Sequence, residues 1–139
     1  MSMNMRQRGV SLIEVLVTLI IISVGLLCLA AMQTRGLQFN HGAYLRSQAT
    51  VLASDIMDRM RLNRTVAQAN GYNIAITDGK PTGTSRRDVD LNEWLTLLET
   101  SLPGGDGSVS CGSNRCTITV QWQESAEANA SSFSYQTQI

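Results

Sequence analysis

Residues 6–34 read RQRGVSLIEVLVTLIIISVGLLCLAAMQT, which is a short basic segment followed by a long apolar stretch. Within residues 10–34 the only charged side chain is Glu14. As a helix rising about 1.5 Å per residue, this stretch is long enough to cross a hydrocarbon core about 30 Å thick. Arg6 and Arg8 precede it, so the positive-inside bias predicts a cytoplasmic N-terminus and an exported C-terminal part. The sequence therefore predicts a chain that meets a membrane.

The overall composition limits what else the protein can be. A length of 139 residues leaves no room for a second large domain. The 11 basic and 11 acidic side chains balance each other, which argues against a generic nucleic-acid binder. The charges are segregated along the chain. Residues 35–64 contain five arginines and two aspartates, whereas residues 65–139 contain four basic and eight acidic side chains. No nucleic acid is expected as a direct partner.

Glu14 is the unusual residue of the apolar stretch. A carboxylate at the centre of a membrane helix costs about 2.5–3.5 kcal/mol on insertion scales, and less near an interface, so it marks a function with a partner by default. The alternative is that Glu14 extends to the cytoplasmic headgroups and has no further role. A cut just before the apolar run, after Gly9, would create a new α-amino group as the nearest cation.

Residues 6–17, RQRGVSLIEVLV, resemble the cleavage and methylation signature of type IV prepilins and type II secretion pseudopilins. The resemblance implies that a prepilin peptidase cuts between Gly9 and Val10 and that Val10 is then N-methylated. It also implies that Glu14 pairs with a neighbouring subunit's N-terminus during filament assembly. The residue at position 10 departs from the family pattern, in which Phe is commonest.

A second apolar pattern follows the membrane stretch. Its members recur at spacings of three and four residues, which predicts one face of an amphipathic helix: Leu45, Ala49, Leu52, Ile56 and Met60. Asp55 and Arg59 are spaced to form a surface ion pair on that helix. Residues 44–64, YLRSQATVLASDIMDRMRLNR, resemble the stem of the PilV group of minor pilins, and the absence of proline before Pro81 favours a minor over a major pilin.

After Arg64 the sequence predicts short elements. Residues 72–76 alternate as a strand would, ending in a turn at Asp78-Gly79. Asp88 or Asp90 is expected to cap a helix that ends before Pro103. Its apolar face comprises Leu91, Trp94, Leu95, Leu98 and Leu102. Residues 117–122 and 133–137 alternate as two strands of an antiparallel hairpin.

These elements together predict an α+β fold, in which a pilin-like long N-terminal helix packs on a small antiparallel sheet. The expected organisation is a cytoplasmic leader (1–9), the transmembrane and assembly half of the helix (10–34), an amphipathic stem (35–64) and a periplasmic α+β head (65–139). The stem face supplies the layer that covers the apolar side of the sheet.

The cysteines and the single histidine indicate no chemistry beyond a crosslink. Cys111 and Cys116 lie in the exported head, where an oxidising compartment favours a disulfide, and the pilin resemblance is consistent with one. A redox motif would have two intervening residues rather than four. No metal site, cofactor or catalytic constellation is expected, because His41 is the only histidine and no nucleophile and base can be paired.

The resemblance implies a minor pilin at or near the tip of a type IV pilus, which primes assembly with other minor pilins, the major pilin and a tip adhesin. It implies a single pass through the bacterial inner membrane with a periplasmic head, followed by an extracellular location in the pilus. Two alternatives stay open. The chain could be a minor pseudopilin of a type II secretion system, or an anchored head that itself binds a ligand or a host surface.

Overall fold

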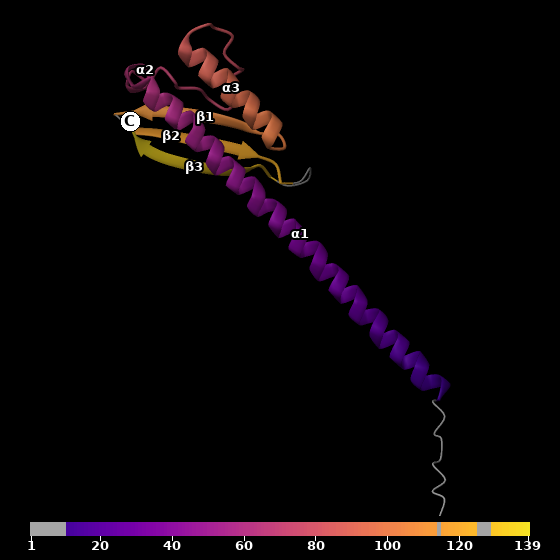
Figure 1. Cartoon of the computed structure of the whole chain (residues 1–139). Coiled ribbons are helices and arrows are strands. Elements are labelled where there is room, and N and C mark those ends of the chain that lie inside the picture. The colour runs from indigo at the N-terminus through magenta and orange to yellow at the C-terminus, as the bar shows by residue number, and fades with distance from the viewer. Residues whose placement is uncertain (1–10, 114, 125–128) are drawn as a thin grey trace, which may run out of the picture. The chain divides into compact units, whose positions relative to one another are not determined.

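The computed structural model of this protein describes residues 11–113, 115–124 and 129–139. The elements in chain order are α1 (Leu12–Leu62), α2 (Arg64–Gln68), α3 (Arg86–Ser101), β1 (Asp106–Gly112), β2 (Arg115–Trp122) and β3 (Ser131–Gln138). A long N-terminal helix and a small antiparallel sheet form the expected pilin-like α+β fold (Figure 1). The chain divides between Asn40 and His41 into an N-terminal unit and a head unit, residues 41–139.

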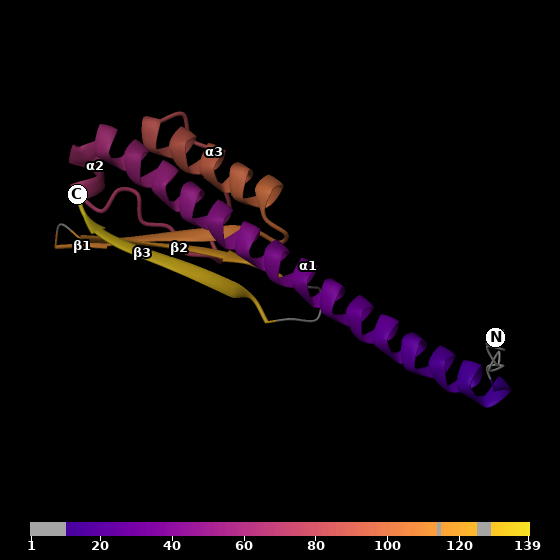
Figure 2. The same ribbon diagram turned by 60° about the horizontal axis from the view of Figure 1, so that its bottom comes forward.

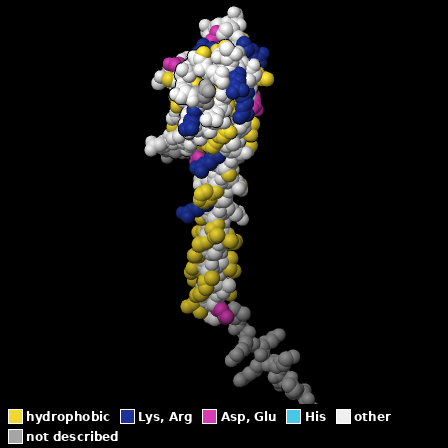
Figure 3. All heavy atoms as spheres, turned by 90° about the vertical axis from the view of Figure 1, so that its left-hand side faces the viewer, with side chains coloured by type: hydrophobic (Ala, Val, Ile, Leu, Met, Phe, Trp, Pro, Cys, Tyr) yellow, Lys and Arg dark blue, Asp and Glu magenta, His cyan; other side chains and the backbone are white. Residues whose placement is uncertain are grey.

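The described part of the N-terminal unit is the first half of α1. The helix continues without interruption through Gly25 and Gly36, and an added Cβ at either glycine would meet nothing within 4 Å. Apolar side chains cover this half of the helix (Figure 3). Every side chain from residue 11 to residue 40 is exposed, so this unit has no core of its own among the described residues.

The head unit consists of helices on one face of a sheet. The second half of α1 and helix α3 lie over the same face of a three-stranded antiparallel sheet of order β1-β2-β3 (Figures 1 and 2). All five positions of the predicted apolar stem face are buried, and Ala53 and Met57 widen that face. The stem helix thus covers the sheet as expected, because its apolar stripe and the inward side chains of β2 bury each other.

Helix α3 begins one turn earlier than predicted, and the expected capping residues are wrong. Ser85 is the N-cap, and its side-chain oxygen accepts a hydrogen bond from the Asp88 backbone nitrogen at 3.2 Å. Asp88 accepts a hydrogen bond from the Ser85 hydroxyl at 2.5 Å, so it completes the cap from within the first turn. Asp90 does not cap the helix, because it is buried and bound to Tyr72. A serine followed three residues later by an acidic residue is typical of a helix N-terminus. Ser85 was not predicted as the cap because Asp88 and Asp90 are themselves common capping residues.

The predicted hairpin of β2 and β3 is confirmed, with both strands longer than expected. Strand β1 was not predicted from the sequence, because its residues are mostly glycine and serine. Gly107 of β1 lies beneath α3, and a Cβ there would collide with the Trp94 ring and with Leu98. The weak strand preference of β1 therefore has a packing cause, because position 107 must lack a side chain where Trp94 of α3 packs on the strand.

The predicted strand at residues 72–76 is also wrong. Only Ile74 pairs with the sheet, through two backbone hydrogen bonds to Val109 of 2.9 and 3.0 Å. The chain then turns, because the Asp78 carboxylate accepts the Ala75 backbone N–H at 2.8 Å. The alternation of Tyr72 and Ile74 reflects two side chains buried in the core rather than a continuous ladder.

Candidate functional site

The predicted processing site, Gly9 and Val10, lies outside the described residues. The description begins at Ser11, and α1 starts immediately after it. The Ser11 carbonyl accepts hydrogen bonds from the backbone nitrogens of Glu14 at 3.0 Å and Val15 at 3.3 Å. The first turn of α1 therefore begins two residues after the predicted cleavage position, Gly9–Val10.

Glu14 lies in that first turn of α1 and is exposed. The unpaired backbone N–H groups of a helix N-terminus favour a negative charge there. Among the described residues no basic side chain lies within ion-pairing distance of the Glu14 carboxylate. The residue lines a shallow hollow of about 300 Å³ with Val15, Thr18 and Leu19. The Thr18 hydroxyl donates to the Glu14 backbone carbonyl at 2.6 Å, and the Glu14 carboxylate forms no hydrogen bond with any residue that the structure describes.

The helix surface beyond Glu14 is apolar and uncovered. Helix α1 contains an 18-residue window with a mean hydropathy of 2.8, and none of that window is buried by the described chain. By length and composition the helix can cross a membrane. Water-exposed apolar surface on this scale is unfavourable, so the surface calls for lipid or for other apolar helices. A single-pass anchor is the membrane arrangement that agrees with this helix.

At the other end of α1, charged side chains join the stem to α3. Arg59 Nε donates to Asp55 at 2.9 Å, which is the predicted ion pair of the stem. Its Nη1 reaches across to Glu93 of α3 at 2.5 Å. Burial by itself lowers the pKa of Arg59, but the hydrogen bonds and charges of Glu93 and Asp55 outweigh it and leave that pKa above its usual range. The arginine therefore stays charged and holds the two helices together.

Asp90 is the only buried charged residue of the described chain, and its role could not be predicted from the sequence. Its Oδ2 accepts the Tyr72 hydroxyl at 2.7 Å, and Asn63 donates to that hydroxyl at 3.0 Å. Its Oδ1 makes no hydrogen bond among the described residues but lies 3.1 Å from Arg86 Nε. Burial raises the pKa of Tyr72, and its hydrogen bond to Asp90 acts in the same direction. This network joins the residue that follows α1, Asn63, to Tyr72 and to helix α3.

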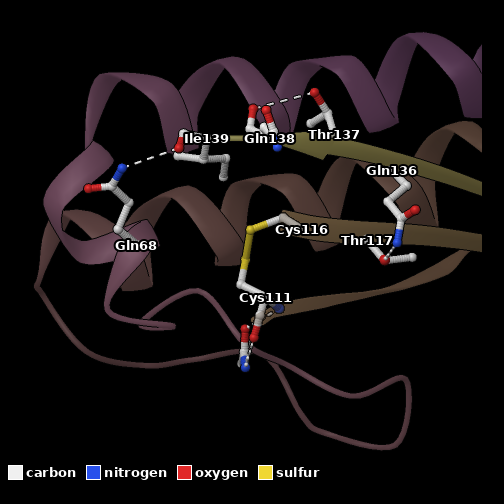
Figure 4. Close-up of a disulfide and its surroundings, with 9 residues drawn as sticks. Gln68, Cys111, Cys116, Thr117, Gln136, Thr137, Gln138 and Ile139 are labelled. Atoms are coloured by element: carbon white, nitrogen blue, oxygen red, sulfur yellow. Dashed lines mark hydrogen bonds between the residues drawn. A yellow bond between two sulfur atoms is a disulfide. The ribbon is translucent and has the colours of Figure 1, made fainter. Parts of the chain in front are cut away.

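A disulfide joins Cys111 of β1 to Cys116 of β2 (Figure 4). The two cysteines are directly opposite each other in the sheet register, with Cα atoms 4.0 Å apart. Cys116 is buried in the core, whereas Cys111 is half-buried. Asn73 flanks the bridge, because its amide accepts the Cys111 N–H at 2.8 Å and donates to the Cys111 carbonyl at 3.3 Å. The crosslink therefore holds the end of β1 to the start of β2, and the Asn73 hydrogen bonds hold the neighbouring loop to β1.

The described residues contain no cluster of histidine, cysteine or acidic side chains that could hold a metal ion. Cys28 is a free, exposed cysteine on the apolar half of α1. The structure brings Cys111 and Cys116 together and leaves Glu14 in the other unit of the chain. The Asp90 network joins residues far apart in sequence, so only their spatial arrangement could reveal it.

Residues 4–27 match the prokaryotic N-terminal methylation motif. This motif is the prepilin leader of type IV pilin-like proteins, so the match supports the pilin superfamily and indicates a pilin-like or pseudopilin-like chain. It favours a structural role over a catalytic one and agrees with processing by a prepilin peptidase and assembly with other pilins. No curated protein and no solved structure matches the chain.

Proposed function

We propose that this protein is a minor pilin of the PilV type, a structural subunit at or near the tip of a type IV pilus. In this role it helps to prime assembly together with other minor pilins, the major pilin and a tip adhesin. The observation that carries the proposal is the methylation motif at residues 4–27, which overlaps the start of α1, a helix whose apolar window is not buried by any described residue. The stem at residues 44–64 supports the choice of the PilV group through its resemblance to that group.

The assembly step depends on Glu14. We propose that the peptidase cuts between Gly9 and Val10, that Val10 is N-methylated, and that Glu14 binds the new N-terminus of a neighbouring subunit in the membrane. Two observations support this role: Glu14 is exposed in the first turn of α1, and it has no cationic partner among the described residues. In an apolar environment, an ion pair with another subunit removes the penalty of an isolated carboxylate.

The same motif fits one further candidate, a minor pseudopilin of a type II secretion system, because both groups share the prepilin leader. The two functions differ in what is lost when the protein is deleted. Loss of surface pili with normal protein secretion supports the minor pilin. Loss of an exported enzyme from the medium with normal pili supports the pseudopilin.

Mass spectrometry of the N-terminus tests the shared premise. The full chain, purified from the membranes of its own host, is expected to begin with N-methylated Val10. Replacing Gly9 with valine is expected to leave the leader attached, because the peptidase requires a small residue before the cut. An intact Met1 in the unaltered chain, or normal cleavage of the Gly9→Val chain, would refute the assignment.

Glu14→Ala tests the assembly step separately. This variant is expected to be cleaved normally and to fall at least about tenfold in sheared filaments, because the ion pair with the neighbouring N-terminus is lost. Thr18→Ala is the matched control, since it alters the same hollow and keeps the carboxylate. Glu14→Ala at the unaltered level in filaments would show that the pairing role is wrong.

A further inference from the structure

The two edges of the head sheet differ in whether another segment of the chain pairs with them. The outer edge of β1 is occupied in part by residues 73 and 74: Ile74 pairs with Val109, and the Asn73 amide bonds to both backbone groups of Cys111. Strand β3 pairs with β2 on one side, and no described strand pairs with its other side. The chain thus occupies part of the β1 edge, whereas the β3 edge has no strand partner among the described residues.

The open edge of β3 lacks the usual protection against pairing. Natural edge strands are kept apart by charged side chains, proline, bulges or short length. Residues 131–138 read SSFSYQTQ and contain no charge and no proline, and the strand pairs in regular register over its whole length. Tyr135 stays 39% exposed although its partner in the register, Ile118, is fully buried. The edge therefore offers unpaired backbone groups beside uncovered aromatic surface.

A hollow lies at each end of this strand, and helix residues with positive charge line both. The first, about 480 Å³, is formed by Arg46, Ser47 and Thr50 of α1 together with Trp122 and residues 131–133. The buried indole N–H of Trp122 has no hydrogen-bond partner among the described residues. The second, about 550 Å³, is formed by Arg61, Arg64, Gln138 and Ile139.

The described residues neutralise these arginines only in part. Arg46 is 72% exposed and forms an ion pair with Glu124 at 3.7 Å, and Arg61 forms one with the exposed Asp58 at 2.9 Å. Arg64 forms no ion pair with any residue that the structure describes. Exposed ion pairs contribute little free energy, so Arg46 and Arg61 can exchange their present partners for acidic side chains of another chain, and Arg64 can add a third contact.

We propose that β3 accepts an extended acidic segment of another exported protein as a fourth strand of the sheet. Backbone hydrogen bonds to β3 supply the affinity, and acidic side chains near the two ends of the segment are held by Arg46 at one hollow and by Arg61 and Arg64 at the other. A second copy of this chain does not fit, because its own β3 carries no acidic residue and would bring the same arginines along. This inference rests on the proposed function, in which the head meets other subunits, and it names the contact surface.

Site-specific photocross-linking in the full chain, in membranes of its own host, tests the proposal. A benzophenone side chain is placed in turn at Ser132, Ser134 and Gln136 of β3, and at Ser110 of β1 as the control. Side chains on neighbouring strands approach within about 5 Å, so the β3 positions are expected to give at least about tenfold more adduct than Ser110. The three adducts are expected on partner residues that also step by two, within one acidic segment.

Charge variants test the role of the arginines. Arg46→Glu with Arg64→Glu is expected to lower the adduct from Ser134 about tenfold or more, because attraction becomes repulsion. Arg46→Lys with Arg64→Lys is the matched control and is expected to stay within about twofold of the unaltered chain, since the charges remain. Denaturation followed by tryptophan fluorescence establishes that each variant is folded, because both tryptophans lie in the head unit.

Three results would overturn the proposal: adducts on the β3 strand of a second copy, adducts on a partner without steps of two, or no adduct from folded protein. The outcome is separable from that of the proposed function. A methylated Val10 without β3 adducts would refute the strand pairing alone. Stepped β3 adducts on a chain that still begins at Met1 would refute the pilin assignment alone.

Discussion

The two halves of α1 have the same secondary structure and opposite surroundings. In the half before residue 41 every described side chain is exposed, including large ones such as Leu19 at 60% and Leu27 at 71%. In the half after it, an apolar stripe is buried against the sheet and α3, with Leu45 at 2% and Ile56 at 0%. Up to residue 32 the first half carries apolar side chains on all sides, and the second half is apolar on one face.

This difference shows how one helix serves two environments. An apolar stripe needs a partner layer, and the chain provides that layer itself in the head unit. A helix that is apolar all round needs an apolar environment on every side, which the chain does not provide among its described residues. Substitutions in the second half are therefore expected to act on the stability of the head, and those in the first half on membrane insertion and assembly.

Trp94→Ala is expected to have the largest effect on head stability, lowering the free energy of unfolding by about 3–5 kcal/mol. The ring is fully buried over Gly107, and its Nε1 donates to the Leu52 carbonyl at 2.9 Å. Urea denaturation of the full chain in detergent, followed by Trp122 fluorescence, measures the loss. Trp94→Phe keeps most of the packing and separates it from the hydrogen bond. A loss below about 1 kcal/mol for Trp94→Ala would contradict the packing described for α3.

Leu45→Ala and Leu19→Ala compare the two halves of α1 directly. Leu45→Ala is expected to cost about 2–4 kcal/mol, because it opens a cavity between the stem and the sheet. Leu19→Ala removes the same atoms from an exposed site and is expected to change head stability by less than about 0.5 kcal/mol. Both are measured by the same denaturation experiment. Equal losses for the two variants would mean that the halves are not independent.

Removing the disulfide is expected to have an intermediate effect. Replacing Cys111 and Cys116 together with serine is expected to lower stability by about 2 kcal/mol, since the closed loop is short. Thermal unfolding of the full chain, with and without reductant, measures the change. The unaltered chain should lose stability on reduction and the double variant should not. Sensitivity of the double variant to reductant would point to Cys28, the third cysteine.

Ser85→Ala is expected to have the smallest effect, about 1 kcal/mol, through loss of the N-cap of α3. The hydrogen bond from Ser85, followed by that from Arg87, lowers the pKa of Asp88. The stability that the lowered pKa of Asp88 provides is fully present at pH values above the ordinary aspartate pKa of about 3.9. It is lost as the pH falls through the lower pKa of Asp88 in the folded state. Ser85→Ala should flatten this acid dependence in denaturation curves between pH 2 and 5, and an unchanged slope would contradict it.

The sequence predicted the elements whose side chains repeat with a regular period. The stem face, the apolar face of α3 and the β2–β3 hairpin carry such repeats, and the structure has all three. It did not predict β1, because Gly107 and the neighbouring serines have weak strand preference. It also misjudged the start of α3 and the segment around Ile74. In both places one side-chain oxygen, of Ser85 or Asp78, accepts a backbone N–H and decides the local backbone.

The candidate sites also divide into those that can be predicted from the sequence and those that only the structure reveals. The motif that contains Gly9, Val10 and Glu14 is continuous in sequence, so it can be read without a structure. The Asp90 network and the open edge of β3 join residues that are distant in sequence, so no local pattern encodes them. Arg59, for example, reads as half of a surface ion pair with Asp55 until the fold places Glu93 beside it.

By itself the sequence determined the membrane-competent helix, the prepilin signature and the amphipathic stem, because these depend on neighbours along one helix or one segment. Only the tertiary structure decided which side chains must be small or charged inside the head, and which edge of the sheet stays open. The physical reason is that burial and strand pairing depend on which surfaces meet, and this is settled by contacts between residues far apart in the chain.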